Sequence, residues 1–141
     1  MNGMLASEVA APRWLARGLL SAFYAVAGVF HLAKPDVFVQ ITPGWVPNPR
    51  EVIIVTGFCE LAGAAGLLTG RWRAAAGIAL AAYAVCVYPA NVKHAIDDLS
   101  GVQTPSLGPW YHVPRLALQP VIVWWCLLAG GVTDWPFRRK G

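Results

Sequence analysis

Four long apolar stretches, separated by short segments rich in charged residues and proline, make up most of the chain. They cover residues 14–33, 52–70, 74–92 and 113–133. Each is close to the ~20 residues that a helix needs to cross a hydrocarbon core of about 30 Å. Because lipid offers the backbone no hydrogen-bond partners, each stretch is predicted to be a transmembrane helix. The fold predicted for residues 1–141 is therefore all-α, a polytopic membrane protein with one four-transmembrane-helix bundle as its single domain.

The composition favours the same class of protein. Hydrophobic residues make up 57% of the 141 residues and charged residues only 13%, whereas soluble domains usually carry about 25% charged residues. The mean hydropathy is +0.51. The net charge of +4 does not indicate nucleic-acid binding, because the cations neither line one face nor alternate with aromatic residues. They lie at the ends of the apolar stretches, and the partner that this pattern predicts is a lipid bilayer.

The distribution of Lys and Arg predicts the direction of the helices. Seven of the 11 cations lie on one side of the four stretches: Arg13, Arg17, Arg71, Arg73, Arg138, Arg139 and Lys140. Since cations accumulate on the cytoplasmic side, both termini are predicted inside, and the two long loops, 34–51 and 93–112, outside the cytoplasm. The first stretch continues past Ala25-Val26-Ala27, a weak cleavage-site match, so it is predicted to be a retained span rather than a signal peptide. The expected location is a bacterial-type inner membrane.

Glu60 lies near the centre of the stretch 52–70, which is otherwise uncharged. An acid at this depth costs on the order of 2–4 kcal/mol unless it is paired or protonated. The alternating directions of the helices bring further polar residues to the same outer half of the bilayer: His31, Asn91, Arg115 and Gln119, with His94 just beyond Asn91. Prolines add to this layer, because Pro89 and Pro120 free the backbone carbonyls four residues before them.

This polar layer has two interpretations. It can be a buried clasp in which Glu60 and Arg115 neutralise each other and the remaining polar groups complete the hydrogen bonds. It can also be a binding or proton-transfer site open to the outside, as ionisable groups within membranes commonly are. The two interpretations are compatible, since a clasp can form the wall of a pocket.

Small residues predict where the helices approach one another closely. Glycines recur along the stretch 52–70, at Gly57, Gly63, Gly66 and Gly70. Small residues let helix backbones approach closely in lipid. The short connection 71–73 predicts an antiparallel hairpin, in which this glycine face packs on the stretch 74–92. The alternative is that the face forms a homodimer.

The remaining candidate chemistry is weak. The three cysteines, Cys59, Cys86 and Cys126, form no C-x-x-C pair and are predicted to be small buried hydrophobes. No metal site and no nucleotide-binding motif is predicted. A group in the second long loop is interpreted as a solvated turn at the membrane surface rather than as metal ligands: His94, Asp97, Asp98 and His112.

An ordered set of short motifs between His31 and Trp125 resembles the DoxX-like family of small membrane proteins. The motifs are His31-x-x-x-Pro35-x-x-Phe38-x-x-Ile41-x-Pro43-x-x-x-Pro47, Gly57-x-x-Glu60-x-x-Gly63-x-x-Gly66-Leu67-Leu68, Pro89-Ala90-Asn91 and Arg115-Leu116-Ala117-Leu118-Gln119. The resemblance implies a four-helix membrane protein. Some members are linked to thiosulfate:quinone oxidoreduction or to membrane thiol redox complexes, and others act as assembly factors for membrane receptors. Without a cysteine pair, this chain departs from the members that perform dithiol chemistry.

The first functional hypothesis is a subunit or small enzyme of a quinone-linked redox system. Glu60 would exchange a proton and His31 would relay it outward, as the catalytic pair. Asn91, Gln119, Arg115 and His94 would bind the ligand, a quinone or similar amphipathic molecule. The alternative is a non-enzymatic module that binds a lipid-like ligand or a transmembrane helix of a partner protein. A transporter is less favoured, because four short spans show no inverted repeat.

Overall fold

The computed structural model describes residues 2–102 and 106–136, with side chains from Arg13 onward. The helices in this part of the chain are α1 (Asn2–Ala33), α2 (Pro35–Val39), α3 (Pro49–Leu68), α4 (Arg73–Cys86), α5 (Tyr88–Leu99) and α6 (Pro109–Ala129). The described residues contain no strand, so the predicted all-α class is confirmed.

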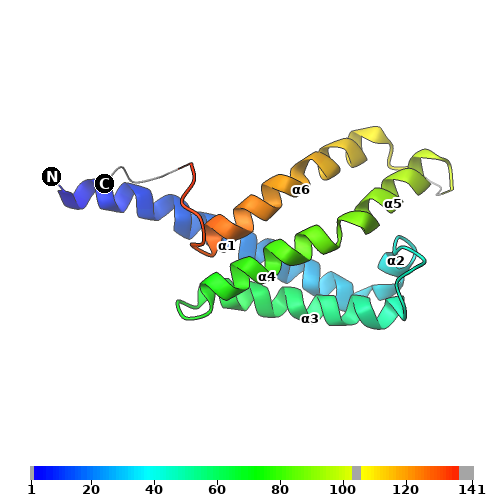
Figure 1. Ribbon diagram of the computed structural model, residues 1–141, viewed down its shortest axis with the longest axis horizontal. Coiled ribbons are helices and arrows are strands. Elements are labelled where there is room, and N and C mark those ends of the chain that lie inside the picture. The colour runs from blue at the N-terminus through cyan, green and yellow to red at the C-terminus, as the bar shows by residue number, and fades with distance from the viewer. Residues whose placement is uncertain (1, 103–105, 137–141) are drawn as a thin grey trace.

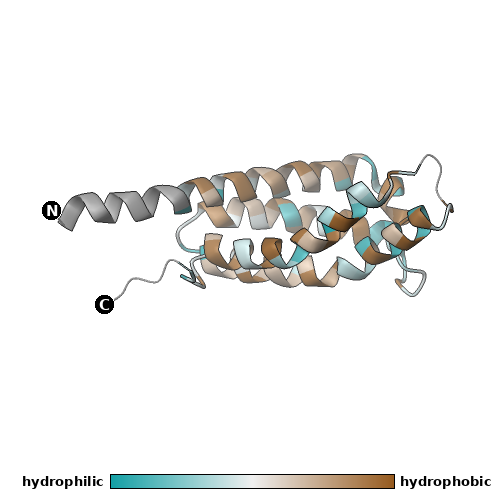
Figure 2. Cartoon of the chain, turned by 90° about the horizontal axis from the view of Figure 1, so that it is seen from above, coloured by the Kyte–Doolittle hydropathy of each residue, from teal (hydrophilic) through white to brown (hydrophobic). Residues whose placement is uncertain are grey.

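Four helical segments are long and apolar enough to cross a membrane: Arg13–Ala33, Pro49–Leu68, Arg73–Leu99 and Pro109–Ala129. Large apolar side chains cover the outside of each, as at Leu19, Phe58, Ile78 and Val121, and Figure 2 shows hydrophobic residues along the length of the bundle. A water-soluble protein rarely exposes such a continuous apolar surface. The surface therefore fits a lipid environment and a multi-pass membrane protein.

Glycines set the spacing between the helices. α1 crosses α3 where a Cβ on Gly28 would lie 2.8 Å from the carbonyl oxygen of Gly57. α3 packs on α4 through Gly63, where a Cβ would lie 2.6 Å from Leu80, and through Gly66, where it would lie 2.8 Å from Ala76. Gly63 and Gly66 thus pack on α4, as the hairpin interpretation predicts, whereas Gly57 contacts α1 instead. The fourth glycine of the face, Gly70, lies in the turn, and a Cβ there would meet nothing within 4 Å among the described residues.

The third span differs from its prediction. The helix is interrupted at Val87, two residues before Pro89, which cannot donate a backbone hydrogen bond. It then continues as α5 to Leu99, so the loop predicted over 93–112 is shorter than expected. Within the other long connection, 34–51, the short helix α2 forms and packs on α1 and α3.

The α3–α4 turn, the end of α6 and the cationic part of α1 lie at one end of the bundle, and α2, α5 and the start of α6 at the other (Figure 1). At the first end Arg13 pairs with Asp134, and Arg17 donates to the carbonyl of Ala129 at 2.8 Å. Three of the seven predicted inner cations, Arg138, Arg139 and Lys140, lie outside the described residues. Which end faces the cytoplasm stays a prediction.

Candidate functional site

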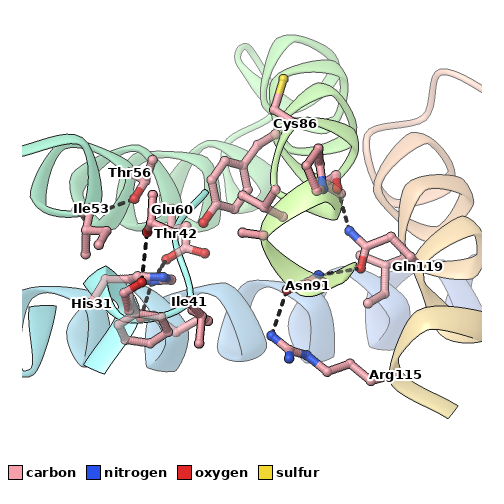
Figure 3. Close-up of a pocket in the computed structure, with 18 of the residues that line it drawn as sticks. His31, Ile41, Thr42, Ile53, Thr56, Glu60, Cys86, Asn91, Arg115 and Gln119 are labelled. Carbon is pink, nitrogen blue, oxygen red and sulfur yellow. Dashed lines mark hydrogen bonds and ion pairs between the residues drawn. The ribbon is translucent and has the colours of Figure 1, made fainter. Parts of the chain in front are cut away.

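A cavity of about 670 Å³ opens at the α2 and α5 end of the bundle. All six helices contribute lining residues, with His31 and Glu60 on one side of the cavity and Asn91 and Arg115 on the other (Figure 3). Two exposed tryptophans, Trp45 and Trp110, line its rim, and Tyr24 and Ile122 line its deeper part. Its size is within the ~300–1,000 Å³ of typical small-molecule sites, and its mostly apolar lining is also typical of them.

The first polar wall of the cavity is a hydrogen-bonded histidine–glutamate pair between α1 and α3. Nδ1 of His31 lies 2.6 Å from Oε2 of Glu60 and 3.0 Å from the carbonyl oxygen of Ala27 (Figure 3). Because both neighbours are oxygen acceptors, Nδ1 is the nitrogen that carries a proton and donates. The ring of His31 also stacks on Phe38, with the ring centroids 3.9 Å apart. Glu60 is only 3% exposed, so His31 is the neighbour that offsets its burial.

Two further residues complete this wall and were missed from the sequence. The hydroxyl of Tyr83, on α4, interacts with the Glu60 carboxylate and with Thr56. Thr56 lies one helical turn before Glu60, and its own hydroxyl donates to the carbonyl of Ile53 at 2.8 Å. The spacing could have revealed both, since Tyr83 lies two turns before Asn91 and Thr56 is at i−4 to Glu60.

The second polar wall is built by α5 and α6 on the other side of the cavity. Arg115 donates from one terminal nitrogen to Oδ1 of Asn91 at 2.7 Å and from the other to Nδ1 of His94 at 2.8 Å. Asn91 in turn donates to Oε1 of Gln119 at 3.3 Å, as Figure 3 shows. The polar atoms of this wall therefore form one connected network, which fixes Arg115 beside the cavity.

Gln119 also satisfies a backbone carbonyl beside the interruption of the third span. Its amide nitrogen donates to the carbonyl oxygen of Ala84, two residues before the end of α4. The prolines were predicted to free the backbone carbonyls of Val85 and Leu116. The carbonyl that accepts a hydrogen bond from the cavity network is instead that of Ala84. α6 itself continues through Pro114 and Pro120 without interruption.

The structure brings five of the six candidate site residues to one cavity: His31, Glu60, Asn91, Arg115 and Gln119. The sixth, His94, does not line the cavity and lies behind it, bonded to Arg115. The clasp interpretation, in which Glu60 and Arg115 neutralise each other, is wrong about this pair. Among the described residues, Glu60 pairs with His31, and no carboxylate lies within ion-pair distance of Arg115.

The predicted burial of the cysteines is correct only for Cys126, which contacts the Tyr24 hydroxyl at 3.5 Å. Cys59 and Cys86 are exposed. Cys86 lines the cavity, whereas Cys59 does not. An apolar sequence does not distinguish a helix face that contacts lipid from one that contacts other helices, and this is why their burial was wrongly predicted.

Two residues of the group interpreted as a solvated turn, Asp98 and His112, are buried, and the turn between α5 and α6 is organised around the Asp98 carboxylate. Asp98 is 2% exposed and accepts hydrogen bonds from Ser106 at 2.8 Å and from the backbone N–H groups of Leu107 and Gly108 at 3.0 Å. His112, 1% exposed, donates from Nε2 at 3.1 Å. No three His, Cys, Asp or Glu side chains gather as metal ligands in the described part of the chain. Asp98 therefore caps the beginning of α6 and holds the α5–α6 turn.

We expect Asp98→Ala to lower the thermal unfolding midpoint by roughly 10 °C, because four donors lose their acceptor in a buried site. The adjacent substitution Asp97→Ala is the matched control, since the Asp97 side chain pairs, among the described residues, only with Lys93, one turn earlier on the same helix. It should change the midpoint by about 2 °C or less. Circular dichroism of both variants in detergent micelles measures the difference. Equal midpoints for the two variants would show that the cap does not stabilise the fold.

Comparison with known proteins supplies a family and no more. The model of a family described as "Domain of unknown function (DUF8561)" matches residues 20–129, which include every cavity-lining residue. No curated protein and no solved structure matches the chain.

Proposed function

The chain belongs to the DUF8561 family, and we propose that it is a membrane subunit of a quinone-linked redox system that binds a quinone, or a similar amphipathic molecule, in the cavity. The observation that carries the proposal is the placement of two polar walls on opposite sides of one apolar cavity. A quinone ring has a carbonyl oxygen at each of two opposite positions, and its tail is apolar. The cavity offers polar groups at its two walls for the two oxygens, and an apolar lining between them for the tail.

The wall of α1 and α3 suits proton transfer. Reduction of a quinone to a quinol takes up two electrons and two protons. The buried pair of Glu60 and His31, joined at 2.6 Å, would pass protons to the nearer quinone oxygen, with the Tyr83 hydroxyl beside the carboxylate. The electrons would come from a redox protein that associates with this subunit. On the opposite wall, Arg115 and Asn91 would orient the other oxygen.

The resemblance to DoxX-like proteins agrees with this assignment, and the proposal includes a bacterial inner membrane as the location, with the cavity facing outward. The alternative is a non-enzymatic module that binds a lipid-like ligand or a transmembrane helix of a partner. Docking of such a helix, or of a second copy, on the α3 glycine face has less support. Gly57, Gly63 and Gly66 are already in contact with helices of the same chain. A partner would have to displace these contacts.

The cysteines allow a direct test of ligand binding. In a Cys59→Ser/Cys126→Ala background, Cys86 is the only thiol of the chain and lies in the cavity wall. We expect decylubiquinone, whose fully substituted ring does not alkylate thiols, to slow the reaction of Cys86 with N-ethylmaleimide. At a concentration ten times its dissociation constant, the slowing should be about tenfold, because only the unoccupied fraction reacts. Mass spectrometry of samples quenched at intervals gives the rate.

The matched control is the variant Cys86→Ala, which retains the exposed Cys59 outside the cavity. Its alkylation rate should not change with decylubiquinone. Slowing at both thiols would indicate a general effect of the quinone on the micelle or on the reagent. Unchanged rates at both thiols, at quinone concentrations up to saturation of the micelle, would contradict quinone binding in this cavity.

A further inference from the structure

Arg115 has an environment that the binding of a neutral quinone does not explain. Its hydrogen-bond partners, Asn91 and His94, contribute an amide oxygen and a ring nitrogen, neither of which is a carboxylate. The ring of Tyr111 lies 5.6 Å from the guanidinium carbon, a favourable but weak contact. No acid among the described residues forms an ion pair with Arg115. Its charge is therefore hydrogen-bonded but not neutralised locally.

The other charged groups near the cavity have partners. Glu60, on the opposite wall, is bonded to His31, and Lys93, on α5, is paired with Asp97. A half-buried cation beside an apolar cavity is costly unless an anion accompanies it. Arg115 is thus the one cation of the cavity wall without an acidic partner in the described part of the chain.

Arg115 also has unused hydrogen-bonding capacity. A guanidinium carries five N–H donors, and the structure gives Arg115 one bond from each of two terminal nitrogens. Its Nε forms no hydrogen bond with a described residue and is not a buried atom. Arg115 lines the cavity, so a ligand there can reach its guanidinium. Two parallel N–H groups of a guanidinium fit an anionic oxygen group particularly well.

We infer that the ligand of this cavity is an anionic amphiphile, whose negatively charged oxygen pairs with Arg115 and whose apolar body fills the space lined by Phe23, Leu118 and Ile122. This inference rests on the proposed function for one feature of the ligand, its quinone ring. Within quinones, it selects those with an acidic ring hydroxyl, which are anions at neutral pH, over neutral quinones. A fatty-acid carboxylate has the same head chemistry. The anion binds on the wall opposite Glu60, which keeps the two negative charges apart.

The test compares two ligands of the same size in the unmodified protein. The acidic ligand is 2-hydroxy-3-undecyl-1,4-naphthoquinone, and the neutral one is its methyl ether. Binding in micelles is measured by the quenching of tryptophan fluorescence, since Trp45 and Trp110 line the rim. Dodecanoate and dodecanol form the second pair, without a quinone ring, and are measured by competition or calorimetry. In each pair whose members bind, we expect the acidic ligand to bind about 10–100-fold more tightly than the neutral one. This is the range for a hydrogen bond to a charged group.

The same measurements in Arg115→Gln assign the preference to the guanidinium. We expect the preference to fall to within about threefold, with the affinity for the methyl ether retained. Arg115→Lys keeps the charge and should keep part of the preference, and circular dichroism shows whether each variant is folded. If neither variant folds, the comparison of ligand pairs in the unmodified protein decides.

The outcomes separate this inference from the proposed function. Equal affinity for the hydroxy and methoxy naphthoquinones would overturn the anion inference and leave quinone binding in place. Preferential binding of dodecanoate with no binding of either naphthoquinone would support the anion site and overturn the quinone role. A preference that persists unchanged in a folded Arg115→Gln protein would show that another group selects the anion. Failure of all four compounds to bind would overturn both proposals.

Discussion

Replacing His31 with leucine should lower the free energy of unfolding by about 3 kcal/mol or more, the typical cost of removing one partner of a buried ion pair. The reason is the position of Glu60, which is 3% exposed and lies within a membrane-spanning helix. His31 holds its carboxylate at 2.6 Å. Leucine offers no donor, so the carboxyl group would be buried without its partner. Unfolding in mixed detergent micelles, followed by circular dichroism, measures the change.

The double variant His31→Leu/Glu60→Leu is the control that isolates the pair. With both polar groups removed, most of the lost stability should return, to within about 1–2 kcal/mol of the original protein, because no charge is left stranded. A His31→Leu protein less than about 1 kcal/mol below the original would contradict this account. It would mean that Tyr83 and water in the cavity satisfy Glu60 without the imidazole.

The sequence predicted this pairing only in part, and the reason is geometrical. Rise per residue and helix direction place His31, Glu60 and Arg115 at similar depth, which is why all three were expected in one layer. Depth does not determine which way each helix is rotated about its axis. The helix of Arg115 packs on α4, α1 and α5, and this packing puts Arg115 on the far wall. No pattern along a single helix specifies it.

The helical spans were predictable because hydrophobicity alone controls insertion into lipid. The extension of the third span to Leu99 was not, since hydropathy declines from Lys93 onward while the helix continues. Its last turn is held by tertiary contacts, in which Asp98 turns inward and accepts hydrogen bonds from Ser106, Leu107, Gly108 and His112. The two adjacent aspartates, Asp97 and Asp98, indicate a surface turn when only the sequence is considered. Only the position of the following helix reveals one of them as a buried cap.

The last prediction concerns the contact between α4 and α6, which holds one side of the cavity together. A Cβ on Gly77 would lie 2.7 Å from the carbonyl oxygen of Cys126 and 2.7 Å from the Cα of Gly130. Both are backbone atoms of the facing segment, which cannot rotate aside as a side chain can. Gly77→Ala must therefore separate the two helices, and we expect it to lower the free energy of unfolding by about 2–3 kcal/mol. Gly130→Ala should have a similar effect, since a Cβ there would lie 2.9 Å from the Cα of Gly77.

Gly18→Ala is the matched control for this substitution. Gly18 lies within α1, and a Cβ there would meet nothing within 4 Å. The change should be neutral or stabilising by up to about 1 kcal/mol, because alanine favours a helix more than glycine does. The same unfolding measurement in micelles compares the three variants. Because α4 carries Tyr83 and α6 carries Arg115, separation of these helices should also widen the cavity and weaken ligand protection of Cys86. If Gly77→Ala were as stable as Gly18→Ala, the close approach of α4 and α6 would be contradicted, and with it the position of Arg115 relative to Glu60.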